Sequence, residues 1–550
     1  MKPASAQVPH QTQPARQGQP VPIDDLPAEP SPQPARLGGG PGSWLLRLLI
    51  GALVTTTCAA GAWFLLGQPA FGIDDADIAQ VYGKHLAEGH GLVYTPGFER
   101  VEGYSSTTWM LVWALAHSIS ARPTLVVSVV SFLLCAWSIA CLLAIAESLK
   151  ISGRRARPLL ALLLTLPAYF TWNTLTLMDL GLWSALIVSY LLLVTRDLIR
   201  EPGPRRAWPL ALVLTGLALT RPEGLLLAPF ALVLSVHARA ARGLGLKASL
   251  HQHAWPAATL LIAMGSLFAF RMAYFGYPLP NTYYAKVSPD RLYNLVGGLR
   301  YVLSSVESMP WIVVLLPLCL GALCAGLSRR KSADAALRIA SIAAAIALLG
   351  FGLPLFEGGD HFGAHRLLQP FLLPALIPAI YLAGRVLEAL PTDTRKHWSA
   401  AIPSSAVLLV LVATLTATWA GFRGTSGLTR EFVIAAHGRN VGTALTQGLA
   451  KDARPSVGAV TAGGIALTYE GRVLDLMGLN WTDMGHSPGP RYGARNHAAF
   501  DTLVFWQAPP EVLLPRFQHR RPSSESAVAY DFDRIVLADL FKSPRFDEEY

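Results

Sequence analysis

Long apolar runs recur along most of this chain, and they constrain its fold more than any other feature. A helix needs about 20 mostly apolar residues to cross a bilayer, since lipid offers the backbone no hydrogen-bond partners. The sequence therefore predicts an all-α polytopic membrane protein with about eleven transmembrane helices. The runs lie near residues 44–66, 124–148, 158–176, 181–199, 208–220, 223–238, 254–275, 310–327, 336–356, 367–387 and 400–421.

The composition agrees with a chain that is solvated mainly by lipid. Hydrophobic residues make up 52% of the sequence and charged residues only 15%, whereas about a quarter of a typical soluble chain is charged. The formal net charge of +10 would suggest nucleic acid in a soluble protein. In a membrane protein Lys and Arg instead bias the topology, so we do not expect nucleic acid as a partner. The cysteines all fall in apolar runs, so they predict neither disulfides nor a zinc site: Cys58, Cys135, Cys141, Cys319 and Cys324.

The distribution of Lys and Arg predicts the orientation of the chain. If the N-terminus is cytoplasmic, the strongly basic loops all fall on the cytoplasmic side, as the positive-inside rule requires. This arrangement holds only if the short apolar segment 109–119 lies in the outer interface without crossing. We therefore expect a multi-pass protein of the cytoplasmic (inner) membrane with its other loops periplasmic. The basic loops are 150–157, 196–206, 237–247, 328–331 and 385–396.

Three regions differ in composition. Residues 1–43 are rich in Pro, Gln and Gly and predict a disordered cytoplasmic tail. Residues 44–422 form the predicted transmembrane domain, whose first periplasmic loop spans 71–123. Residues 423–550 are more hydrophilic, with strand-like runs SVGAVTA, RVLDLMGL, DTLVFW and DRIVLADL, and predict a small periplasmic α/β domain.

The first loop opens with three aspartates, Asp74, Asp75 and Asp77. One interpretation is a helix start, with Asp74 as the N-cap and the other two in the first turn. The other is functional, because carboxylates beside a membrane are costly unless they face water or partners. The rest of the loop, GHGLVYTPGFERVEGYSS, predicts a polar wall near the aspartates, formed by Glu99, Arg100, Glu102 and Tyr104.

Three further predicted outer loops carry clustered polar residues. PLPNTYYAKV offers Asn281, Tyr284 and Lys286, which suit a phosphate and a stacked sugar or, alternatively, anchor the chain at the interface. In TRPEG, Arg221 and Glu223 either bind substrate or pair with each other.

The third loop, EGGDHFGAHR, contains Asp360, His361, His365 and Arg366. The two histidines have i, i+4 spacing, but no third metal ligand is evident and the glycines disfavour a helix, so we predict no metal site. Arg366 is a better candidate for clamping a phosphate. No Walker A, GxGxxG, HExxH or GxSxG motif is present in its required context, which disfavours nucleotide, zinc-protease and α/β-hydrolase chemistry.

The ordered set of these motifs resembles the GT-C superfamily of glycosyltransferases, in particular the mycobacterial terminal arabinofuranosyltransferases and their proteobacterial relatives. That branch has an acidic pair after its first span, followed by G-x-G-L-V-x-N-x-G-E-R-V-E-G-Y-T-N. The chain departs from it at Thr95, at an inserted Phe98 and at Ser105 and Ser106. The later motifs of the branch follow in the same order: LMDLGLWSAL, TRPEGL, GYPLPNTYYAKV, GGDHFGAHRLLQP and VLDLMGLNW. In the first of them Asp179 stands in place of a glutamate.

The resemblance implies transfer of a sugar, D-arabinofuranose by analogy with this branch, from a polyprenyl-phosphate donor to a glycan or pilin-like protein acceptor in the periplasm. It assigns the general base to Asp74, with Asp75 as its neighbour. It also leaves a divalent cation open as a cofactor. Donor or acceptor binding falls to Glu99, Arg100, Glu102, Tyr104, Asp179, Arg221, Glu223, Asn281, Tyr284, Lys286, Asp360, His361 and Arg366.

Two other classes of function remain as alternatives. A transporter or flippase of lipid-linked saccharides would place charged residues along the middle of several spans. A non-catalytic scaffold for envelope assembly would tolerate loss of the acidic pair.

Overall fold

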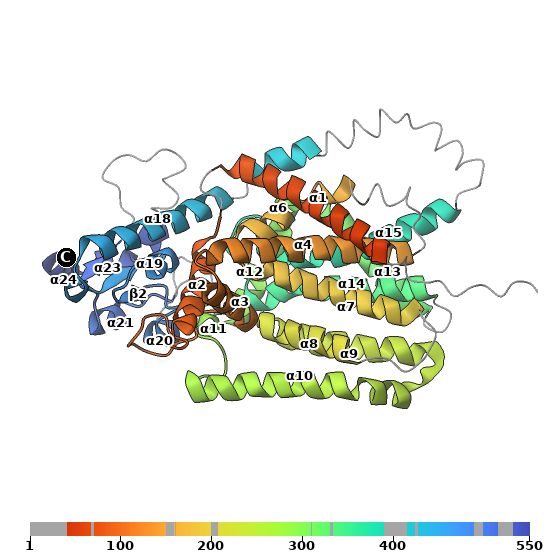
Figure 1. Ribbon diagram of the computed structural model, residues 1–550, viewed down its shortest axis with the longest axis horizontal. Coiled ribbons are helices and arrows are strands. Elements are labelled where there is room, and N and C mark those ends of the chain that lie inside the picture. The colour runs from red at the N-terminus through yellow and green to blue at the C-terminus, as the bar shows by residue number, and fades with distance from the viewer. Residues whose placement is uncertain are drawn as a thin grey trace, which may run out of the picture.

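The computed structural model describes residues 41–67, 71–149, 159, 161–199, 207–309, 311–329, 334–389, 415–423, 427–488, 499–514 and 532–550. Over these residues the chain is mostly helical and carries one small parallel sheet near its C-terminal end (Figure 1). The predicted tail lies outside the described residues, apart from the first positions of helix α1.

Seven helices among the described residues are long and apolar enough to cross a membrane, or eight if the bent pair α12 and α13 forms one span. They confirm the expectation of a polytopic helical membrane protein and coincide with seven of the predicted spans. These helices are α1 (Pro41–Leu66), α4 (Pro123–Ser148), α7 (Leu180–Ile199), α9 (Gly224–Arg239) continued by η3 (Ala240–Leu244), α10 (Leu246–Tyr274), α14 (Ala335–Glu357), and η4 (Arg366–Phe371) continued by α15 (Leu372–Ala389).

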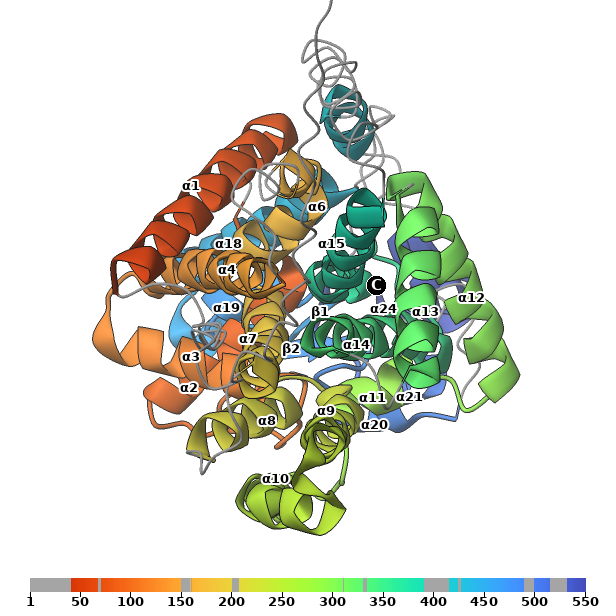
Figure 2. The same ribbon diagram turned by 90° about the vertical axis from the view of Figure 1, so that its right-hand side faces the viewer.

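The helices form a bundle in which α4, α7, α14 and α15 are the most buried, and α10 lies at the outer edge beside α8 and α9 (Figure 2). The core is made of apolar side chains from these central helices, among them Ile139, Trp183, Ile346 and Leu376. Large apolar side chains such as Leu261 and Ile262 stay exposed on α10. An apolar exterior of this kind is what a lipid environment allows.

The four remaining predicted spans are not among these seven helices. In place of a continuous helix near 158–176, the described residues form α6 (Pro167–Phe170) and the π-turn η2 (Thr171–Leu175). Pro167 starts this segment, and the side chains of Thr171 and Thr174 donate to backbone carbonyls four residues earlier. Hydrogen bonds from threonine side chains to the preceding turn bend a helix, and a proline interrupts it. Together they account for the break in the predicted span 158–176.

The other three segments are shorter than spans or lie partly outside the described residues. Helix α8 (Trp208–Thr220) has 13 residues and forms a hairpin with α9, and α13 (Ile312–Ser328) has 17. Helix α12 (Arg291–Ser308) meets α13 at an angle of 115°. Most of the predicted span 400–421 lies outside the described residues.

The first loop folds into two helices, α2 (Asp74–Ala87) and α3 (Thr107–Ile119), which pack against each other. Helix α3 has 13 residues, so the prediction that segment 109–119 does not cross agrees with its length. The N-cap of α2 is Ile73, which makes no side-chain capping bond, so the assignment of Asp74 as the N-cap is wrong. Asp74 is instead the first helical residue, and its side chain is used elsewhere.

The C-terminal region contains α18 (Leu428–Gly448) and a three-stranded parallel sheet in the order β2-β1-β3. The strands β1 (Val457–Ala459) and β2 (Val473–Asp475) coincide with the predicted runs SVGAVTA and RVLDLMGL. The third strand, β3 (Val512–Leu513), was not expected. The short helices here are α19 (Gly463–Thr468), α20 (Thr482–His486), α21 (Thr502–Gln507), α23 (Ala538–Phe541) and α24 (Pro544–Glu549).

Two predicted strands in this region are helical. DTLVFW forms α21, because the Asp501 carboxylate caps the helix by accepting from the Leu503 backbone N–H at 2.8 Å. DRIVLADL is also mainly helical, and its buried Val536, Leu537 and Leu540 recur at helical spacing. In both segments local capping and a 3.6-residue period outweigh the β-branched composition.

The first loop and the C-terminal region share one hydrophobic core. Ile78, Val81 and Tyr82 of α2 belong to the same buried cluster as Val457 of β1 and Phe505 of α21. The Tyr82 hydroxyl also bonds the Asn480 side chain at 3.0 Å. The C-terminal region therefore packs directly on the loop that bears the aspartates.

Candidate functional site

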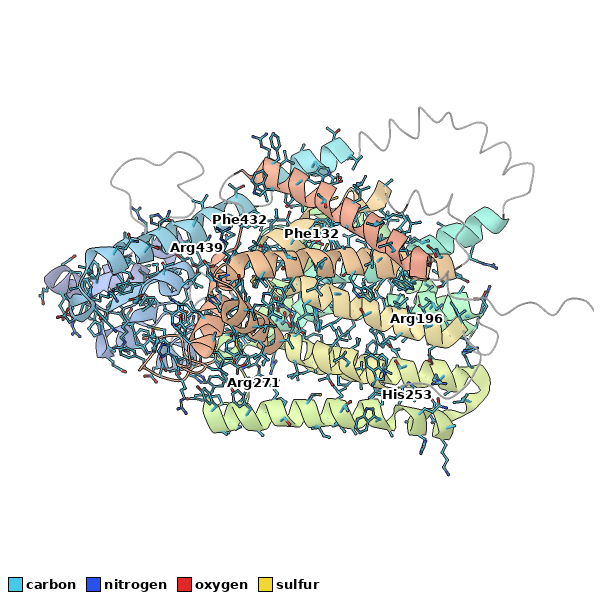
Figure 3. The ribbon with its side chains drawn as sticks, viewed as in Figure 1. Phe132, Arg196, His253, Arg271, Phe432 and Arg439 are labelled. Atoms are coloured by element: carbon cyan, nitrogen blue, oxygen red, sulfur yellow. The ribbon has the colours of Figure 1, made fainter. Side chains whose placement is uncertain are left out.

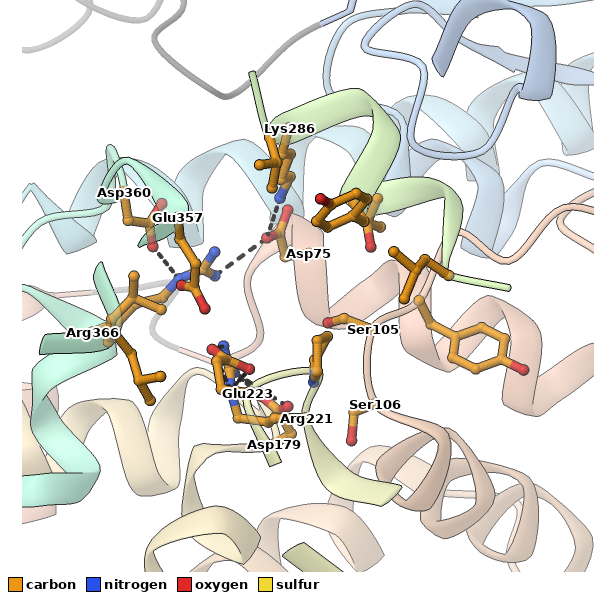
Figure 4. Close-up of a pocket in the computed structure, with 18 of the residues that line it drawn as sticks. Asp75, Ser105, Ser106, Asp179, Arg221, Glu223, Lys286, Glu357, Asp360 and Arg366 are labelled. Carbon is orange, nitrogen blue, oxygen red and sulfur yellow. Dashed lines mark hydrogen bonds and ion pairs between the residues drawn. The ribbon is translucent and has the colours of Figure 1, made fainter. Parts of the chain in front are cut away.

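A cavity of about 400 Å³ opens between the first loop and one end of the helix bundle. Its walls come from α2, the turn between α8 and α9, the short helix α11 (Asn281–Lys286) and the loop between α14 and η4 (Figure 4). These segments lie far apart in the sequence. The labelled lining residues are Asp75, Ser105, Ser106, Asp179, Arg221, Glu223, Lys286, Glu357, Asp360 and Arg366.

Asp75 extends from the first turn of α2 to a point between two cations. Its Oδ2 atom lies 3.5 Å from Lys286 Nζ and 3.3 Å from Arg366 Nη1. Burial raises the pKa of Asp75, but Lys286 and Arg366 outweigh burial and hold the pKa below its usual value. Asp75 is therefore ionised at neutral pH.

Arg366 is fixed from a second side by the carboxylate of Asp360, which accepts from its Nε atom. The guanidinium also lies 4.0 Å from the centroid of the Phe362 ring. Burial raises the pKa of Asp360, and Arg366 and His361 together lower it well below its usual range. Gly358 and Gly359, with φ values of 86° and 82°, end α14 and turn the chain so that Asp360 meets Arg366.

A second charge cluster, around Arg221, lines the same cavity. Its Nη1 atom lies 3.1 Å from Asp179 Oδ1, and its Nη2 atom lies 2.8 Å from Glu223 Oε1. Arg221 and Glu223 therefore do pair with each other, and Asp179 joins them. All three side chains are at most 12% exposed, so the cluster is rigid and still lines the cavity.

Asp74, by contrast, contacts the C-terminal region. Its two carboxylate oxygens accept the backbone N–H groups of Gly463 at 3.1 Å and Gly464 at 2.8 Å. A side chain at Gly463 would have its Cβ 2.1 Å from the Asp74 carbonyl oxygen, so the close approach requires glycine there. Asp74 thus connects α2 to α19, and Asp75 is the aspartate that faces the two cations.

The predicted polar wall is formed only in part. Tyr104 lines the cavity, but Glu102 forms a buried ion pair with Arg271 at 2.8 Å. Glu99 accepts the Thr482 backbone N–H at 3.2 Å, and Arg100 lies over the ring of Tyr274, 4.7 Å from its centroid.

Asn281 and Tyr284 join α11 to the C-terminal region instead of facing the cavity. The Asn281 amide donates to the backbone carbonyls of Gly478 and Leu479 at 2.7 and 3.1 Å. The Tyr284 ring stacks on His486 with centroids 4.1 Å apart. These contacts hold α11 in place, and Lys286 at its end reaches Asp75.

Two arginines in this part of the fold were missed from the sequence. Arg271 pairs with Glu102, and Arg439 Nη1 donates to both Asp77 oxygens at 2.8 Å. Arg271 lies at the end of the bundle nearest the C-terminal region and Arg439 lies on α18 within that region, whereas Arg196 and His253 lie toward the other end of the bundle (Figure 3). A charged residue inside an apolar run is a known sign of a buried partner, and that sign was available for Arg271.

A second cavity, of about 260 Å³, lies between α2 and the C-terminal region. Asp75, Ile78 and Leu479 line both cavities, so Asp75 is reached from two sides. The polar residues that line only this second cavity are Asp74, His361, Arg430, Glu431, Thr461, Asp475 and Asp533.

His361 lies beside Asp360, with 3.2 Å between Nδ1 and Oδ1. His365 is oriented elsewhere, with its Nε2 atom 2.9 Å from the Ser304 hydroxyl. Within the described ranges, no three His, Cys, Asp or Glu residues are grouped so that they could hold a metal ion.

In comparisons with known proteins, no family model, no curated protein and no solved structure matches this chain. The site must therefore be interpreted from its own geometry.

Proposed function

We propose that this chain is an integral membrane glycosyltransferase that transfers a sugar from a polyprenyl-phosphate donor to a glycan or protein acceptor outside the cytoplasmic membrane. The observation that carries the proposal is the position of Asp75. An ionised carboxylate lies beside two cations in a cavity at the end of a bundle of apolar helices.

The cavity walls suit a lipid phosphate. Lys286 and Arg366 supply the positive charge that a phosphate group needs, and the Arg366 guanidinium can bind two of its oxygens. The apolar part of the wall includes Leu226 and Phe356, whose side chains are 51% and 68% exposed. A polyprenyl chain bound along these residues would lead from the phosphate into the surrounding lipid.

Asp75 is placed to act as the general base. Glycosyl transfer requires a group that takes the proton of the acceptor hydroxyl as its oxygen attacks the anomeric carbon. The base must then border both substrates, and Asp75 lines both cavities. The first cavity would hold the donor, and the second, between α2 and the C-terminal region, would hold the acceptor.

This assignment exchanges the roles that the sequence motifs gave to the two aspartates. Asp74 is engaged by Gly463 and Gly464, so it positions α2 against the C-terminal region. Arg221, Asp179 and Glu223 would contact the sugar. D-arabinofuranose remains the proposed sugar, on the strength of the motif resemblance, and the cavity would face the periplasm.

A transfer assay separates the proposal from its alternatives. The full chain, purified in nanodiscs, is incubated with decaprenyl-phosphoryl-arabinose labelled in the sugar and with isolated cell envelope. The proposal predicts labelled envelope glycan or protein, and at least about tenfold less label with Lys286→Met. A flippase would instead move the intact labelled donor across a liposome bilayer, and a scaffold would do neither.

A further inference from the structure

The surroundings of Asp75 conflict with its proposed role. One oxygen of its carboxylate, Oδ2, contacts both Lys286 and Arg366, at 3.5 and 3.3 Å. Two adjacent cations stabilise the charged form of a carboxylate and so make it a weak base. The contacts that position Asp75 therefore also oppose proton uptake, and a base must be released from them before it can work.

The two cations are arranged so that Asp75 can leave them. Arg366 is held independently by Asp360 and by the ring of Phe362. Lys286 ends helix α11, which is fixed to the C-terminal region through Asn281. The Arg366 guanidinium therefore keeps two other contacts when Asp75 leaves, and the helix that carries Lys286 stays in place.

The Asp75 side chain itself is 16% exposed, and it lines the cavity wall on which Lys286 and Arg366 also lie. A phosphate group that enters the cavity would meet the same pair of cations. Its oxygens offer arginine the bidentate geometry that a single carboxylate oxygen does not.

We propose, on the basis of the function inferred above, that Asp75 and the donor phosphate compete for Lys286 and Arg366. The phosphate displaces the carboxylate from both cations, and the displaced carboxylate becomes the base. Donor binding thus activates Asp75, and the acceptor hydroxyl is deprotonated only when the donor is in place.

The step balances in atoms and charge. The acceptor oxygen forms a bond to the anomeric carbon, and the bond between that carbon and the phosphate oxygen breaks with its electron pair moving to the oxygen. The hydroxyl proton moves to Asp75. The polyprenyl phosphate gains one negative charge, which Lys286 and Arg366 compensate. When this product leaves, Asp75 loses its proton and returns to the two cations.

Competition makes a prediction that a simple binding role for Asp75 does not make. Decaprenyl phosphate is titrated into the purified full chain in detergent at pH 7, and its affinity is measured for the wild type and for variants. Asp75→Asn removes the competing carboxylate, so this variant should bind decaprenyl phosphate about tenfold more tightly than the wild type. Lys286→Met removes a phosphate partner and should bind about tenfold more weakly. Asp74→Asn, which makes the same charge change next to Asp75, should stay within about twofold of the wild type.

Each outcome decides one point. If Asp75→Asn binds decaprenyl phosphate no more tightly than the wild type does, the proposed competition between Asp75 and the phosphate is wrong. The same holds if Asp74→Asn tightens binding equally. In either case the proposed transferase stands. If the wild type shows no saturable binding of decaprenyl phosphate, the proposed function fails as well. Equal binding of phosphatidic acid would overturn the polyprenyl assignment, and equal binding of inorganic phosphate would show that the lipid chain contributes nothing.

Discussion

The carboxylate of Asp75 lies 3.3 Å from the guanidinium of Arg366, a residue 291 positions further along the chain. This contact joins the start of α2 to the loop after α14, and Lys286 adds α11 to the same point. Three of the motifs picked out in the sequence thus meet at one carboxylate.

The buried pair between Glu102 and Arg271 should contribute strongly to stability. Both side chains are at most 3% exposed, and the loss of one partner leaves the other charge buried alone. Arg271→Ala should therefore lower the free energy of unfolding by about 3–5 kcal/mol, measured by thermal unfolding in detergent. Arg100→Ala removes an arginine that only stacks on Tyr274 and should cost less than about 1 kcal/mol. Equal losses for the two variants would contradict the role given to the buried pair.

Asp74 should hold the C-terminal region on the first loop. Asp74→Ala leaves the backbone N–H groups of Gly463 and Gly464 without their acceptor, which should cost roughly 1–3 kcal/mol. Hydrogen exchange of these two amides should accelerate. Asp290→Ala, which removes the cap of α12 and its bonds to Leu292 and Tyr293, is the matched control. Asp290→Ala should accelerate hydrogen exchange in α12 alone. If exchange at Gly463 and Gly464 is unchanged in Asp74→Ala, Asp74 does not hold the C-terminal region on the first loop.

His365 should make the protein sensitive to acid. Burial lowers its pKa to about 4, although Asp360 acts in the opposite sense, and it is packed against Tyr301 and Ser304 of α12. The folded state favours the neutral form of His365. Its contribution to the free energy of unfolding is therefore fully present above about pH 6.5 and is lost as the pH falls toward 4. The loss amounts to up to about 3 kcal/mol.

His365→Asn should remove this dependence. His365 has a φ of 50°, a left-handed conformation that asparagine adopts more readily than most residues. Thermal unfolding at pH 7 and at pH 4.5 should show a larger drop for the wild type than for the variant. Identical drops would mean that His365 is not the responsible group.

Much of the fold could be predicted from the sequence, because membrane spans depend on local composition. The apolar runs that became α1, α4, α7, α10 and α14 are long enough to be recognised alone. The failures came where side chains compete with the backbone, as in η2, and where capping decides between helix and strand, as at Asp501. Residue composition alone does not report either effect.

The candidate site was predicted in its residue types but not in its detailed contacts. The motifs identified Lys286, Arg366 and Asp360, because charged residues beside apolar runs are costly and therefore informative. They did not separate Asp74 from Asp75. Neighbouring residues in the first turn of a helix point about 100° apart, so which one faces the cavity depends on how α2 packs against the C-terminal region. That packing involves Gly463 and Gly464, almost 400 positions away.

The most direct test of the account is the rate of sugar transfer by Asp75→Asn and Asp74→Asn, with decaprenyl-phosphoryl-arabinose as donor and cell envelope as acceptor. Asp75→Asn should bind the donor and reduce kcat by about 10²–10⁴-fold, the usual contribution of a general base. Asp74→Asn keeps an acceptor for one of its two amides and should lose less than about tenfold. A wild-type rate for Asp75→Asn, or a larger loss for Asp74→Asn than for Asp75→Asn, would contradict the assignment of Asp75 as the base.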